Sequence, residues 1–275
     1  GTITPDFTYN DQGSITVGGQ TIRNWNGQSF GTVDATQILV DSLNVGMATI
    51  SVRMGPTTFY TMLDKFGVGR LTGIDLEGEQ PGTMFVPGDE NWSESNLGTN
   101  SFGQGLAVTP IQMITMASAI ANGGLMMQPR VVHEIIDGQT VIPSHPANLG
   151  RPISAETARI VTDMMVAVVN EGLDGTATVP GYTIAGKTGT AQISTPIGYE
   201  LQASIASFIG FFPADDPQVI VLIKLDRPTD FWGSQTAAPA FANLAERLAI
   251  LLEIPTDDMR HELSAQGGAV NHINR

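Results

Sequence analysis

Residues 187–190 read Lys187-Thr188-Gly189-Thr190 and place one ammonium group, two hydroxyls and a glycine within four positions. The preceding segment, Gly181-Tyr-Thr-Ile-Ala-Gly, is rich in residues that favour a strand. Side chains alternate along a strand, so Thr188 and Thr190 would emerge on one side, and Gly189 would let a ligand or another backbone approach closely. Together with the free amides of an edge strand, these groups predict a receptor for an extended peptide that ends in a carboxylate.

The same stretch admits two other interpretations. Gly181 to Thr188 also satisfies the phosphate-loop pattern, which needs a strand before its first glycine and a helix that begins at the lysine. Here the strand-forming residues lie inside the pattern, and Pro196 follows too soon for a good helix start. The third interpretation is a plain strand end with a surface lysine.

Ser42 and Asn44 form a second polar pair, between two short helical patterns. Thr32 is expected to cap a helix from residue 33 to residue 41, and a second helix would run from residue 45 to residue 53. A break between these helices would place both polar side chains at the junction. The alternative is that Ser42 and Asn44 are ordinary capping residues.

Composition excludes several classes of function. The 275 residues carry a net charge of −14, with only 13 lysines and arginines and no basic run, so a nucleic-acid partner is not expected. Cysteine is absent, and the four histidines show no ligand spacing, so we expect no metal and no cofactor. No apolar run reaches the length of a membrane span.

The remaining elements predict an α+β fold, because mostly helical segments precede a strand, a hairpin and a helix. A small hairpin is expected around Gly18-Gly19, a strand at 130–136, and an antiparallel hairpin of residues 203–212 and 218–225. The other expected elements are helices that begin at Pro56, Ile111 and Ser154, and a long loop region at 67–105. A final helix at 237–252 is expected to face a sheet through Phe241, Leu244, Leu248 and Leu251 or Leu252. From Pro255 onward the chain is polar and is expected to fray.

Lys187-Thr188-Gly189, preceded by Ser42-x-Asn44, resembles two of the three motifs of the penicillin-recognising serine acyltransferases. The flanking sequences resemble class B penicillin-binding protein transpeptidase domains over about residues 1–253. These are GQGLAVTP at 103–110, AIANGG at 119–124, AGKTGTAQ at 185–192, ASFIGFFPA at 206–214 and APAF at 238–241. The resemblance implies a β-lactamase/transpeptidase-like fold, an antiparallel sheet flanked by helices plus a helical subdomain. We expect residues 30–172 to form mainly that subdomain, residues 180–253 the sheet strands and last helix, and residues 254–275 a polar tail.

The third motif of the family, Ser-x-x-Lys, supplies the nucleophile, and this sequence does not contain it. Methionine, isoleucine and valine, not serine, stand three positions before Lys65, Lys187 and Lys224. In the family that helix lies shortly upstream of a segment resembling Gly1 to Asp6, so we expect the nucleophile helix and the strands before it in a missing N-terminal part of the same protein. The alternative is a parent protein that has lost the serine.

The resemblance implies a peptidoglycan D,D-transpeptidase that attacks the D-Ala-D-Ala bond of a cell-wall stem peptide through an acyl-serine intermediate. Ser42 would relay a proton, Asn44 would bind the substrate amide, and Lys187 would hold the Ser42 hydroxyl. Thr188, Gly189 and Thr190 would bind the substrate, including its terminal carboxylate.

The implied partners are the stem peptide, β-lactams and other cell-wall synthesis proteins, at the outer face of the bacterial cell membrane. Two other functions remain open: a serine β-lactamase, and a non-catalytic β-lactam-binding scaffold or sensor.

Overall fold

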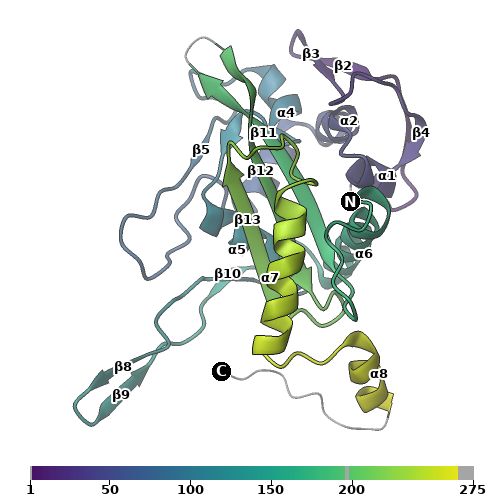
Figure 1. Ribbon diagram of the computed structural model, residues 1–275. Coiled ribbons are helices and arrows are strands. Elements are labelled where there is room, and N and C mark those ends of the chain that lie inside the picture. The colour runs from purple at the N-terminus through teal and green to yellow at the C-terminus, as the bar shows by residue number, and fades with distance from the viewer. Residues whose placement is uncertain (1, 196–197, 266–275) are drawn as a thin grey trace. The chain divides into compact units, whose positions relative to one another are not determined.

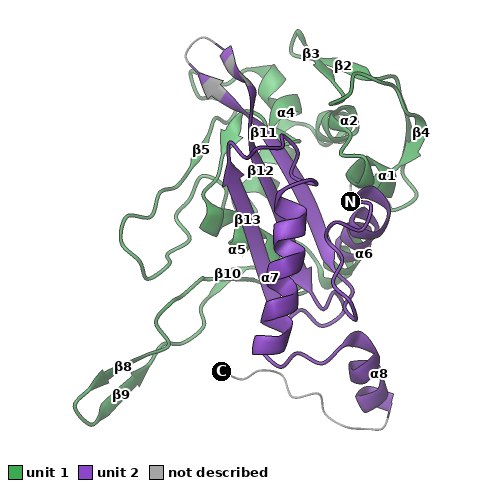
Figure 2. Cartoon of the chain, viewed as in Figure 1, with its two compact units in different colours: residues 1–160 green, residues 161–275 purple. Residues whose placement is uncertain are grey.

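The computed structural model describes residues 2–195 and 198–265 (Figure 1). The chain divides into two compact units, residues 1–160 and 161–275, and the division falls within one helix (Figure 2). Each unit has its own architecture and is described by itself. The expected domain boundaries stay a prediction.

The five helices predicted for the first part of the chain occur in the expected order, together with α4 (Glu94–Asn100), which was not predicted. The predicted helices in unit 1 are α1 (Ala35–Val40), α2 (Asn44–Met54), α3 (Pro56–Lys65), α5 (Pro110–Ala121) and the start of α6 (Ala155–Gly172). Proline occupies the first turn of α3 and of α5, where its missing N–H costs no hydrogen bond. Thr109 and Gln112 form a reciprocal capping box at the start of α5, which satisfies two amides that the helix leaves free. No described helix combines the length and the apolar character that crossing a membrane requires.

The described strands of unit 1 pair in twos, all antiparallel. The pairs are β1 (Thr8–Asp11) with β4 (Gly31–Asp34), β2 (Ser14–Val17) with β3 (Gln20–Arg23), β5 (Thr83–Met84) with β6 (Leu106–Ala107), β7 (Met126–Met127) with β10 (Asn148–Gly150), and β8 (Glu134–Asp137) with β9 (Thr140–Pro143). The predicted hairpin at Gly18-Gly19 is confirmed, with Val17 opposite Gln20.

Three expectations for unit 1 need correction. Thr32 does not cap a helix, because it lies in β4 opposite Asn10, and the side chain of Asp34 caps α1 instead. The strand expected at 130–136 begins only at Glu134, because the carboxylate of Asp75 accepts the amides of Val131 and Val132 (2.7 and 2.8 Å). The region 67–105 is not loop throughout, since it contains β5 and α4.

Unit 2 is built on a three-stranded antiparallel sheet in the order β11 (Ala185–Thr195), β12 (Gly198–Phe212) and β13 (Val219–Asp226). Helix α7 (Ala237–Leu251) packs on β12 and β13, as Figure 1 shows. The fully buried rings of Phe208 on β12 and Phe241 on α7 lie between the sheet and the helix, with their centroids 4.6 Å apart. Gly186 and Gly210 are opposite one another in the ladder, and a side chain on either would overlap the Phe208 ring.

The predicted hairpin and final helix are confirmed, but the expected apolar face of α7 is only partly right. Phe241 is buried, whereas Leu244 is 38% exposed and Leu251 is 75% exposed. The helix instead buries four alanines, which let it lie close to the aromatic rings of the sheet: Ala237, Ala238, Ala245 and Ala249.

The expectation of fraying from Pro255 onward is wrong for residues 257–265, which form α8 (Asp257–Ala265). The side chain of Arg260 is only 5% exposed and donates to Asp215 (2.5 Å) and to Asp257 (2.8 Å). Asp257 also accepts the amide of Thr183 (2.6 Å), just before β11. A polar segment therefore docks through one buried cation shared by carboxylates from the β12–β13 turn and from α8 itself. Residues 266–275 of the expected tail lie outside the described residues.

We predict that Arg260→Met lowers the free energy of unfolding by about 3 kcal/mol, because it leaves carboxylates that have lost their partner at a partly buried site. Urea denaturation followed by circular dichroism measures the change. Arg247→Met, at an exposed position on α7, is the matched control and is expected to change stability by less than about 0.5 kcal/mol. Equal effects of the two substitutions would show that the ion pairs of Arg260 do not stabilise the fold.

Candidate functional site

Lys187 lies in β11, an outer strand of the sheet that pairs only with β12 among the described strands. Its ammonium Nζ lies 3.1 Å from the carbonyl oxygen of Thr188 and 3.4 Å from the Thr188 hydroxyl. Burial of the ammonium lowers the pKa of Lys187 to about 8. The predicted edge strand is thus confirmed, and it carries a partly buried lysine whose charge is less stable than that of a lysine in water.

The strand also decides against the phosphate-loop alternative. That motif needs a helix from its lysine onward, because the phosphates bind at the helix N-terminus. Here residues 185–195 are extended and run antiparallel to β12, with Lys187 opposite Ile209.

Gly189 and Thr190 lie where the strand meets two other segments. A side chain on Gly189 would come within 2.6 Å of the Ser207 hydroxyl, so glycine keeps β11 and β12 in close register there. The Thr190 hydroxyl accepts a hydrogen bond from the amide of Gly233 (3.1 Å), in the connection between β13 and α7. In the ladder Thr188 lies opposite Phe208, and Thr190 lies opposite Ala206. Because the two threonines are two positions apart in one strand, their side chains lie on the same face of the sheet.

Ser42 and Asn44 lie at the predicted break between two helices in unit 1. Helix α1 ends at Val40 and α2 begins at Asn44, with Leu43 fully buried between the two polar residues. Ser42 adopts a left-handed conformation with φ of 52°, which is uncommon for a residue with a side chain. The side-chain amide of Asn44 donates from Nδ2 to the carbonyl oxygen of Arg23 (3.1 Å). The surrounding contacts must therefore hold this turn in its unusual conformation.

The segment after β3 provides those contacts. Asn24, which is 3% exposed, accepts the amide of Val45 in the first turn of α2 (3.1 Å). Its own amide group donates to the buried carboxylate of Asp11 (2.7 Å). Trp25 donates from its indole N–H to the carbonyl of Asp41 (3.1 Å), so the segment binds the chain on both sides of Ser42.

The sequence does not single out residues 24–27 for this role. The partners lie 13 to 21 positions apart in the chain, so no local pattern reveals them. The burial of Asp11 and Asn24 is seen only in the structure, where each satisfies the other, as buried polar side chains require a hydrogen-bond partner.

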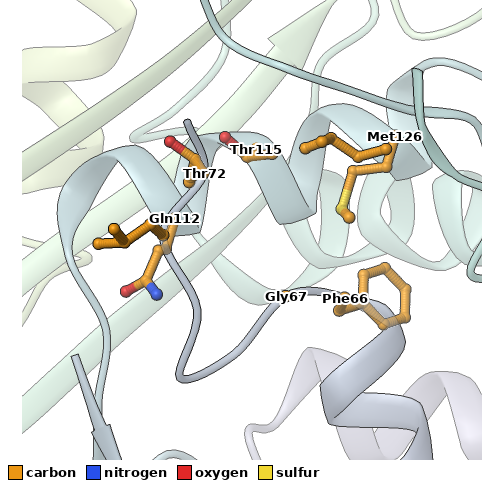
Figure 3. Close-up of a pocket in the computed structure, with 8 residues that line it drawn as sticks. Phe66, Gly67, Thr72, Gln112, Thr115 and Met126 are labelled. Carbon is orange, nitrogen blue, oxygen red and sulfur yellow. The ribbon is translucent and has the colours of Figure 1, made fainter. Parts of the chain in front are cut away.

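Two hollows among the described residues are lined by other parts of the chain than these motifs. A cavity of about 20 Å³ in unit 1 is lined by the segment that follows α3, by α5 and by strands β7 and β10, and it has room for about one water molecule (Figure 3). A shallow hollow on α7 is lined by Ala240, Asn243, Leu244 and Arg247. Within residues 2–195 and 198–265, no three His, Cys, Asp or Glu side chains gather in a way that could hold a metal ion.

Comparison with known proteins identifies the family. The family model of the penicillin binding protein transpeptidase domain matches residues 1–246. The chain belongs to this family. Its transpeptidase α+β fold agrees with the solved structure of penicillin-binding protein 3 from Mycobacterium tuberculosis in complex with aztreonam. The TM-score is 0.83 at 36% identity, and the match covers 92% of this chain and 59% of that one.

Two curated relatives show how much of a transpeptidase-family protein the chain represents. Stage V sporulation protein D of Bacillus subtilis is 36% identical over 241 residues, which are 86% of this chain and 37% of that protein. Penicillin-binding protein PbpB of Mycobacterium tuberculosis is 38% identical over 259 residues, 89% of this chain and 38% of that protein. The chain therefore spans well under half the length of these relatives.

For the transpeptidase-family lysine, we predict an NMR titration of Lys187 with a midpoint near pH 8, because burial disfavours its charged form. Labelling with ¹³C at lysine Cε gives only three resonances, and Lys187→Arg assigns the one that disappears. The sign for stability follows from the ordinary lysine pKa of about 10.4 in the unfolded chain. Between pH 8 and about 10.4 the unfolded chain binds more protons at Lys187 than the folded chain does. The contribution of Lys187 to the free energy of unfolding therefore rises with pH over this range. A midpoint above pH 10 would contradict the burial of this ammonium.

For the turn that carries Ser42, we predict that Asn24→Asp lowers the free energy of unfolding at pH 7.5 by about 2 to 3 kcal/mol. The new carboxylate would face that of Asp11, so the pair would keep a proton in the folded state, with a raised pKa. The folded state would bind more protons than the unfolded state, so the loss shrinks as the pH falls toward 4.5. Asn26→Asp, exposed in the same loop, is the matched control and should show no such pH dependence. Urea denaturation at both pH values measures these changes.

Proposed function

We propose that this chain is part of a peptidoglycan D,D-transpeptidase, which cross-links cell-wall stem peptides through an acyl-serine intermediate. The observation that carries the proposal is the placement of Lys187, Thr188 and Thr190 on an outer strand of the sheet in a member of the transpeptidase family. One relative named for this activity is the peptidoglycan D,D-transpeptidase FtsI of Buchnera aphidicola, which is 31% identical to this chain over 235 residues.

In this proposal a stem peptide lies extended along the outer edge of β11. The edge supplies backbone hydrogen bonds, and the residues of the motif supply specificity. Thr188 and Thr190 bind the terminal carboxylate of the peptide, and Gly189 leaves room for its backbone. The amide of Thr190 contributes to the oxyanion hole, a kind of interaction worth about 3 kcal/mol when one donor is removed.

Lys187 and the pair of Ser42 and Asn44 act on the leaving group. A lysine with a pKa of about 8 is still mostly charged at neutral pH, so it attracts a carboxylate. It also releases a proton more readily than a lysine in water, which suits a group beside a proton relay. Ser42 can donate and accept in one geometry and carries the proton to the departing D-Ala amine, while Asn44 binds the amide of the substrate.

The nucleophile in this proposal belongs to a Ser-x-x-Lys segment elsewhere in the same protein. Its serine attacks the D-Ala-D-Ala carbonyl, D-Ala leaves, and an amine of a neighbouring stem peptide resolves the acyl-enzyme. We place the reaction at the outer face of the bacterial cell membrane, where its substrate lies, together with other cell-wall synthesis proteins.

β-Lactams are the second class of ligand that we propose. Penicillin-binding protein 3 of Mycobacterium tuberculosis, 36% identical to this chain, was solved in complex with ampicillin and with aztreonam. A β-lactam offers a strained amide in place of the D-Ala-D-Ala amide, so the acyl-serine bond would form at the same site.

We predict that Lys187→Ala lowers the rate of penicillin acylation of the full-length protein at least 100-fold, because it removes the cation to which the proposal assigns a part in proton transfer. Intact-mass spectrometry after timed exposure to penicillin counts the acylated fraction. Lys224→Ala, exposed on β13 of the same sheet, is the matched control and should be acylated like the wild type.

The same measurement separates the alternatives. Undiminished acylation of Lys187→Ala would refute the assigned role of Lys187. Rapid loss of the adduct, with turnover of a chromogenic cephalosporin, would indicate a serine β-lactamase. A wild-type protein that binds penicillin without gaining its mass would indicate a non-catalytic scaffold or sensor.

A further inference from the structure

We propose that Gly233 is a positioning residue, which fixes the Thr190 hydroxyl as a hydrogen-bond donor toward the carboxylate of the ligand. The inference rests on the proposed function, in which Thr190 binds that carboxylate. Gly233 lies outside the Lys187-Thr188-Gly189 motif, 43 positions after Thr190, in the connection between β13 and α7 (Figure 1).

The hydrogen bond determines what the Thr190 hydroxyl can still do. The amide of Gly233 donates to Thr190 Oγ1 over 3.1 Å and therefore uses one acceptor position of that oxygen. A hydroxyl has a single proton, which points away from a donor that approaches its oxygen. The remaining proton of Thr190 is thus left for an acceptor, and a carboxylate is an acceptor-only group that forms strong, charge-assisted hydrogen bonds.

The connection that carries Gly233 is tied to the sheet on both sides of this bond. The buried hydroxyl of Ser204 on β12 donates to the carbonyl of Phe231 (2.6 Å). The carbonyl of Gly233 accepts the amide of Ala238 in the first turn of α7 (2.9 Å). Gly233 therefore joins the motif strand to the start of α7, and its amide has little freedom to move away from Thr190.

Only glycine fits at position 233 in this arrangement. A Cβ atom there would lie 2.6 Å from the backbone oxygen of Ser207 and 2.7 Å from that of Gly189. Both are backbone atoms of paired strands, so they cannot move aside as a side chain would. An alanine must shift the connection away from β11, which lengthens the hydrogen bond to Thr190 without changing Thr190 itself. This makes Gly233→Ala a selective test.

The experiment is a double-mutant cycle on the full-length protein, with the rate of acylation by penicillin as the readout. Gly233→Ala and Thr190→Val are each expected to lower the rate about tenfold, the effect of losing one hydrogen bond to a charged group. The double variant should be no slower than Thr190→Val alone, because Gly233 acts through the hydroxyl that valine lacks. Ser234→Ala, the next residue in the turn, is the matched control and should leave the rate unchanged.

A second readout separates positioning from a general loss of structure. Penicillin methyl ester lacks the carboxylate, so Gly233→Ala should leave its acylation rate unchanged relative to the wild type. Additive losses in the cycle, or equal losses with penicillin and its ester, would overturn the inference while leaving the proposed function intact. A wild-type protein that penicillin does not acylate would instead remove the proposed function, and this inference with it.

Discussion

The ladder between β11 and β12 is the constraint on which the site in unit 2 depends. Among the described strands β11 pairs only with β12, so its backbone is held from that edge alone. Gly186 and Gly210 face each other in this ladder and leave space for the ring of Phe208, which packs against Phe241 of α7. The aromatic core can therefore lie directly beneath the strand, and the register that places Lys187 opposite Ile209 is fixed by packing as well as by hydrogen bonds.

Both polar motifs are held by residues that carry no catalytic group themselves. Buried Asp11 and Asn24 bind the start of α2 and keep the turn at Ser42 in a left-handed conformation. In unit 2, the connection after β13 reaches back to Thr190. In both places a short polar motif receives a hydrogen bond from, or donates one to, a segment at least 20 positions away in the chain.

Local signals allowed the prediction of much of this architecture. The edge strand at Lys187, the Gly18-Gly19 hairpin and the helix that begins at Pro110 follow from propensity, turn chemistry and capping residues within a few positions. The features that escaped prediction depend on contacts between residues far apart in sequence. Helix α8 is polar and has little apolar surface of its own, and it docks through Arg260 onto Asp215, 45 positions earlier. The buried face of α7 was misjudged because alanines, and not leucines, match the space left by the aromatic rings.

Helix α8 also bears on where the physical domain ends. The match to the family model stops at residue 246, before the last turn of α7 and before all of α8. Yet the segment just before β11 has its Tyr182 hydroxyl bound to the carbonyl of Ile254 (2.5 Å) and its Thr183 amide bound to Asp257. A chain cut at residue 246 would therefore leave the approach to the lysine strand without these hydrogen-bond partners. In this protein the hydrogen-bonded fold extends beyond the stretch that the family model matches.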